Sequence, residues 1–146
     1  MMVMAIIAIL ITVLTPTLLG AASRAKDRAM QASLRNATTG AKGYYFSKAD
    51  YTTATPALMS AEIGGLTFVG PTANPSGANS VSVYGFSPTQ VFLSGTSKSG
   101  TCFYVFDDET AGTTKYAKAA AGASGCAANG SPIPTDTSPT GWQATW

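Results

Sequence analysis

The first 22 residues constrain this chain more than any other stretch, because they carry no charged side chain. The run MMVMAIIAILITVLTPTLLGAA is almost entirely apolar, and the first charge is that of Arg24. A helix of about 20 residues spans the hydrocarbon core of a bilayer, which is about 30 Å thick. A single domain of 146 residues has no core that could enclose a helix apolar on all sides. We therefore expect residues 1–22 to lie in lipid or against other copies of the same segment.

A cleaved signal peptide and a plain single-span anchor are the two simpler interpretations of this segment. Gly20, Ala21 and Ala22 resemble a signal-peptidase site, but the positively charged region that begins such signals is missing. Within the run, Pro16 lacks an amide hydrogen and Gly20 is conformationally permissive. We expect a kink or a local loss of helix near Pro16 and Gly20.

Residues 23–46 should continue the helix as an amphipathic half. Apolar side chains recur there at three- and four-residue spacing, which predicts one buried stripe of Met30, Leu34, Ala37, Ala41 and Tyr44. The basic residues of a second face should point to solvent or to a neighbouring subunit; they are Arg24, Arg28, Arg35 and Lys42. A helix from Met1 to Phe46 would be about 70 Å long, so its apolar half must project from the domain.

The remaining chain predicts an antiparallel sheet. Residues 47–65 should form a connecting loop with a short helix from Ala57 to Glu62, capped by Thr55. Residues 66–118 should form the sheet, with strands at 66–69, 81–86, 90–95 and 101–106 and a weakly paired segment at 113–118. Because the turns are short, we expect a roughly four-stranded antiparallel arrangement in an α+β domain of residues 23–146.

The two cysteines, Cys102 and Cys126, predict one disulfide and an oxidising compartment. Such a bond would tie the C-terminal loop, residues 119–146, to the last strand. A zinc site is the alternative for two cysteines, but neither a second cysteine pair nor any histidine is available to complete it. Trp142 and Trp146 are expected to pack the tail onto the sheet.

No residue pattern in the sequence indicates catalysis, a metal or a cofactor. Histidine is absent, which excludes histidine-based triads and zinc hydrolases. The only acidic cluster, Asp107 to Glu109, suits a solvated turn better than a calcium loop. The basic helix face could bind DNA phosphates, although such faces are usually only solvated or paired. We expect a protein that is not an enzyme.

The run from Val3 to Leu10, followed by Pro16, resembles the N-terminal helix of bacterial type IV pilins and pseudopilins. In that family the helix anchors the subunit in the inner membrane and then forms the core of a helical filament. A processed glycine, an N-methylated aromatic residue and a glutamate precede this run in the family and have no counterpart in the printed sequence. The resemblance covers about the first twenty residues.

The resemblance implies a structural pilus subunit that polymerises with identical copies. It assigns the core of the filament, and the membrane helix before assembly, to Met4, Ala5, Ile6, Ile7, Ala8, Ile9, Leu10, Val13 and Leu14. Its implied partners are membrane lipid, the inner-membrane assembly machinery and sister subunits, and its implied location is an extracellular filament. Two alternatives are a type II secretion pseudopilin and a membrane-anchored adhesin or binding domain that never polymerises.

Overall fold

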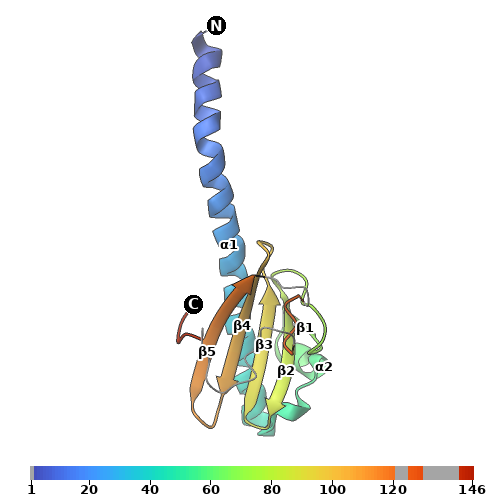
Figure 1. Ribbon diagram of the computed structural model, residues 1–146. Coiled ribbons are helices and arrows are strands. Elements are labelled where there is room, and N and C mark those ends of the chain that lie inside the picture. The colour runs from blue at the N-terminus through green and yellow to red at the C-terminus, as the bar shows by residue number, and fades with distance from the viewer. Residues whose placement is uncertain (1, 121–124, 130–141) are drawn as a thin grey trace.

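The computed structural model describes residues 2–120, 125–129 and 142–146, and for residues 2–19 it describes the backbone alone. A long N-terminal helix packs on a five-stranded sheet (Figure 1). The helical elements are α1 (Met2–Lys48), η1 (Tyr51–Thr53) and α2 (Pro56–Glu62), and the strands are β1 (Thr67–Val69), β2 (Ser80–Ser87), β3 (Gln90–Thr96), β4 (Thr101–Asp108) and β5 (Thr113–Ala120). We call the sheet and the elements packed on it the head.

α1 is one uninterrupted helix, so the local loss of helix predicted near Pro16 and Gly20 is not present. A proline removes one backbone hydrogen bond and crowds the preceding turn, and a long helix can continue past it by bending. The helix also ends at Lys48 rather than at Phe46. There the amide of Ala49, which has a φ of 54°, donates to the carbonyl of Tyr45 at 2.7 Å.

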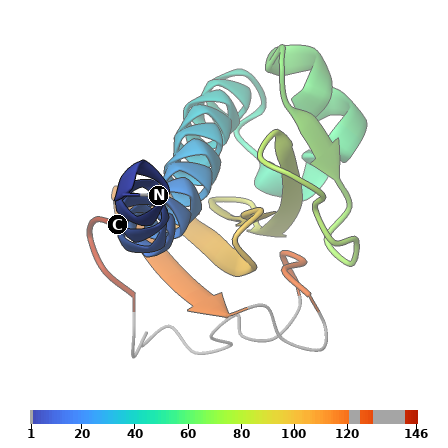
Figure 2. The ribbon, with the colours of Figure 1, turned by 90° about the horizontal axis from the view of Figure 1, so that it is seen from above.

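The predicted buried stripe of α1 is confirmed. Its five side chains are at most 2% exposed and face the sheet; they are Met30, Leu34, Ala37, Ala41 and Tyr44. The inward side chains of β2, β3 and β4 meet them, and these are Val81, Val83, Val91, Leu93, Phe103 and Val105. Figure 2 shows α1 lying along one face of the sheet. The period of two in each strand sends these residues to the same side, which places the core between helix and sheet.

Two glycines allow close approaches to the core face of the sheet. A Cβ at Gly95 would lie 2.1 Å from the terminal carbon of Met30, and a Cβ at Gly85 would lie 1.9 Å from the carbonyl oxygen of Tyr51. The Tyr51 amide in turn donates to the carbonyl of Pro88 at 2.9 Å, so η1 is held against the turn between β2 and β3.

The sheet differs from the prediction in strand number and in one direction. Its strand order is β1-β2-β3-β4-β5, and the pairing of β1 with β2 is parallel, whereas the other three pairings are antiparallel. β5 pairs with β4 over its whole length, from Thr113 opposite Asp108 to Ala120 opposite Thr101. The loop 70–79 carries turn residues that fit either a reversal or a crossover, and the chain uses it as a crossover.

The connection between α1 and the sheet follows the sequence prediction closely. Thr55 caps α2 by accepting a hydrogen bond from the Leu58 amide, and Met59 is buried beneath the helix. Leu58, in contrast, is 45% exposed. The 3-10 helix η1 was not predicted; the side chain of Asp50 caps it by accepting from the Thr52 amide at 2.8 Å.

Candidate functional site

The half of α1 that extends past the head contains the residues predicted to form the filament core. Its backbone is helical throughout, and Figure 1 shows it leaving the head without touching the sheet. The side chains of the predicted core residues, from Met4 to Leu14, lie outside the described part of the structure. Where side chains are described, no helix combines the length and the apolar character needed to cross a membrane.

An ion cluster fastens the lower end of α1 to the turn between β4 and β5. The Lys42 ammonium lies 2.9 Å from Asp107 Oδ1 and 3.1 Å from Glu109 Oε1. The Tyr51 hydroxyl donates to the same Glu109 oxygen at 3.1 Å, and the Thr114 hydroxyl donates to Asp107. Four elements, α1, η1, β4 and β5, together with the turn, therefore share one polar network.

This cluster corrects two expectations. Asp107 is not part of a solvated turn, because its side chain is fully buried. It follows Phe103 and Val105 at alternate positions of β4 and therefore points toward α1. Lys42, which was expected to point to solvent or to a neighbouring subunit, is 34% exposed, and its ammonium pairs with Asp107 and Glu109 inside the head. The burial of Asp107 could have been predicted from the sequence, because Asp107 continues the period of two that places Phe103 and Val105 on the inner face of β4.

Burial and pairing shift the pKa values of this cluster in different directions. Burial raises the pKa of Asp107, and the hydrogen bonds from Thr114 and Lys42 oppose that rise. Burial also acts to raise the pKa of Glu109, but hydrogen bonds from Lys42 and its other neighbours outweigh it and lower that pKa. Burial, and then the nearby carboxylates, raise the pKa of the Tyr51 hydroxyl. Burial therefore has the larger effect on the pKa of Asp107, and pairing has the larger effect on the pKa of Glu109.

The cluster joins α1 to the end of β4 and to the turn that follows it. It contains two carboxylates but only one cation, and Asp107 Oδ2 has no hydrogen-bond partner within the described structure. Among the described residues, no group of three or more His, Cys, Asp or Glu side chains could hold a metal ion. Its chemistry is the mutual neutralisation of Lys42 with Asp107 and Glu109; Asp107 is fully buried, whereas 34% of the Lys42 side chain is exposed.

The disulfide between Cys102 and Cys126 is confirmed, with a Cα–Cα distance of 5.4 Å. The backbone around Cys126 is also held by hydrogen bonds to the sheet and to the loop before β2. The Cys126 amide donates to the Asn74 side chain at 3.0 Å, and the Ala128 amide donates to the Ser82 hydroxyl at 3.0 Å. Residues 125–129 therefore lie across the outer face of the sheet, opposite α1.

The two tryptophans hold the end of the chain on the sheet, as predicted. Trp146 packs against Phe103 and Tyr116, each with a ring-centroid distance of 5.0 Å. Beside it, Gln143 exchanges two backbone hydrogen bonds with Tyr116, which extends the sheet by one bridge at the edge of β5. Trp142 lies on the outer face, 6.3 Å from Phe106.

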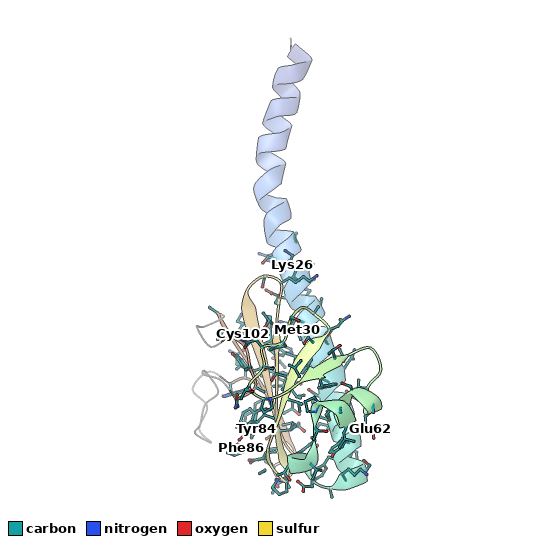
Figure 3. All side chains as sticks on the ribbon, turned by 90° about the vertical axis from the view of Figure 1, so that its right-hand side faces the viewer. Lys26, Met30, Glu62, Tyr84, Phe86 and Cys102 are labelled. Atoms are coloured by element: carbon teal, nitrogen blue, oxygen red, sulfur yellow. A yellow bond between two sulfur atoms is a disulfide. The ribbon has the colours of Figure 1, made fainter. Side chains whose placement is uncertain are left out.

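An outer aromatic cluster was not predicted. It occupies outward positions of β2, β3 and β4 together with the tail, and its members are Tyr84, Phe86, Phe92, Phe106 and Trp142. The rings of Phe92 and Phe106 lie 4.7 Å apart on directly paired residues. Figure 3 shows Tyr84 and Phe86 together on the side of the sheet away from α1, and Phe86 is 54% exposed.

The aromatic residues near the end of α1 are divided between the core and the surface. Tyr44 and Tyr51 are at most 2% exposed, and Tyr45 stacks on Tyr51 at 5.0 Å. Phe46, in contrast, is 84% exposed. It lies two residues after Tyr44, about 200° around the helix, and so faces away from the sheet.

Comparisons of the chain with protein-family models, with curated proteins and with solved structures find no match.

Proposed function

We propose that this chain is the structural subunit of a bacterial filament of the type IV pilus kind. Residues 1–22 anchor the subunit in the inner membrane and later pack against the same segment of sister subunits. An assembly machinery in that membrane moves subunits from one state to the other, and the heads form the outer layer of a filament outside the cell.

The division of α1 into two halves carries this proposal. The half from Met30 to Tyr44 is buried against the sheet, whereas the half before Gly20 extends past the head. The extending half has an uncharged, apolar sequence. A large apolar surface left outside a domain marks an interaction with lipid or with protein. The same apolar side chains can contact lipid while the subunit is in the membrane and can contact the helices of sister subunits once it is in the filament.

The head is built to hold α1 in a fixed position, which also supports the proposal. The buried stripe fixes the helix along its length, and the Lys42 cluster fastens its lower end. A filament with helical symmetry needs every subunit to present its helix at the same angle, because any variation would break the repeat.

An electron micrograph of filaments from cells that express the chain tests the proposal, with Ala8→Asp as the decisive variant. An unpaired carboxylate in a helix bundle costs several kcal/mol, so we expect Ala8→Asp to abolish filaments. Ala57→Asp is the matched control, since Ala57 is exposed in the first turn of α2, where a negative charge is favourable. Normal filaments from Ala8→Asp, or a chain that stays monomeric in its native membrane, would contradict the proposal.

A further inference from the structure

A group of exposed basic side chains surrounds α1 at the point where it leaves the head. We call it the cationic collar, and it consists of Arg24, Lys26, Arg28 and Lys98. The three helix residues lie within about 6 Å along the helix axis. Figure 3 shows Lys26 at this junction. Lys98 belongs to the turn between β3 and β4, whose Ser99 hydroxyl donates to Asp27 and so places the turn beside the same part of the helix.

The collar contains cations on both sides of the helix. At 3.6 residues per turn, Arg28 lies about 40° from Arg24, whereas Lys26 lies about 160° from it. Asp27 is the only acidic residue among the first 49, and it is engaged by Ser99. The junction therefore presents net positive charge on opposite sides of the helix, directly below a segment of 23 residues without any charge.

We propose that the cationic collar binds the phosphate headgroups of anionic phospholipids while residues 1–22 lie in the bilayer. This inference rests on the proposed function, in which the subunit waits in the membrane before assembly. A bilayer surface is a plane crossed by the helix, so it meets basic side chains on every side of the helix at one height. Basic residues next to such a surface attract anionic lipid, and the attraction falls off within a Debye length of about 10 Å.

A nucleic acid fits this arrangement less well. A rod-like polyanion would need basic side chains along one face, and the face of Arg24, Arg28 and Arg35 would end at Lys42. Lys42, however, is occupied by Asp107 and Glu109. Lys26 lies on the other side of α1 and could not contact the same rod.

The test reconstitutes the full chain in phosphatidylcholine vesicles containing a minor fraction of phosphatidylglycerol. Spin-labelled lipids of each headgroup report, by electron paramagnetic resonance, which lipid is enriched in the motionally restricted layer around the protein. At an ionic strength of about 0.1 M, we expect phosphatidylglycerol to be preferred by about fivefold, which corresponds to about 1 kcal/mol for one basic residue near a charged surface. The preference should fall toward one at high salt, because salt screens it.

Single substitutions on opposite sides of the helix distinguish a bilayer surface, which contacts both sides of α1, from a partner that contacts only one face. Lys26→Gln and Arg28→Gln should each reduce the preference, and the quadruple variant that also carries Arg24→Gln and Lys98→Gln should abolish it. Arg35→Gln is the matched control, because Arg35 is exposed but lies about 16 Å below Arg24 along the same helix, beyond the Debye length. Far-ultraviolet circular dichroism should show the same fold for all four variants.

Three results would overturn the inference. They are restricted lipid without a headgroup preference, a preference that survives the quadruple variant, and a loss caused by Arg28→Gln but not by Lys26→Gln. Binding of single-stranded DNA that depends on Arg24 and Arg28 alone would also count against it. Absence of any motionally restricted lipid would instead contradict membrane anchoring, and with it the proposed function.

Discussion

Replacing Lys42 by methionine should be the most informative single change in the head. The substitution keeps the length of the side chain but leaves Asp107, which is fully buried, and Glu109 without their cation. Breaking a buried ion pair by removing one partner costs about 3–5 kcal/mol. Because 34% of the Lys42 side chain is exposed, solvent screening reduces this cost, and we expect about 2–3 kcal/mol.

Urea unfolding of the full chain in mild detergent, with the disulfide intact, measures this loss through the fluorescence of the tryptophans packed on the sheet. Adding Asp107→Asn to Lys42→Met should recover about half of the lost stability, because the uncompensated charge is then removed. Arg35→Met is the control, and its effect should stay within about 0.5 kcal/mol since Arg35 is exposed.

The pH dependence of Lys42→Met gives a second check. Burial already raises the pKa of Asp107, and loss of the Lys42 charge raises it further. A carboxyl with a raised pKa in the folded state stabilises that state as the pH falls below this pKa. The stability deficit of Lys42→Met should therefore shrink on acidification. A deficit below about 0.5 kcal/mol at neutral pH, or no recovery with Asp107→Asn, would refute the role assigned to the cluster.

Two further predictions concern the disulfide and two glycines of the head. Replacing both Cys102 and Cys126 by alanine should cost about 3 kcal/mol of unfolding free energy for a sequence separation of 24 residues, measurable by the shift of the urea midpoint. Gly85→Ala should destabilise by about 1–3 kcal/mol, because its Cβ would lie 1.9 Å from the Tyr51 carbonyl oxygen. Gly43→Ala meets nothing within 4 Å and should stabilise α1 by about 0.5–1 kcal/mol, and an opposite order of the two glycine variants would contradict the packing described.

The features that sequence predicted best are those with a strong local period. The spacing of Met30, Leu34, Ala37, Ala41 and Tyr44 identified the buried side of α1 without error. The alternation in 81–86, 90–95 and 101–106 located three strands to within two residues at each end. Both periods follow directly from backbone geometry, and no tertiary information is needed to read them.

Features that depend on distant partners were missed. The parallel pairing of β1 with β2 is decided by the path of the loop 70–79, on which periodicity gives no information. Asp107 was assigned to solvent because three consecutive acidic residues are usually exposed, and its burial depends on Lys42, 65 positions earlier in the chain. The outer aromatic cluster was overlooked because outward strand positions are ordinarily polar.

The buried stripe of α1 also determines how the head would respond to tension. In the head α1 runs lengthwise along the sheet (Figures 1 and 2), so a pull on its outer end acts along the contact surface rather than away from it. Met30, Leu34 and Tyr44 would then slide against the strands together, and the Lys42 cluster would resist at the far end. Such a shear arrangement shares the force among all contacts at once, whereas a peeling geometry would break them one after another.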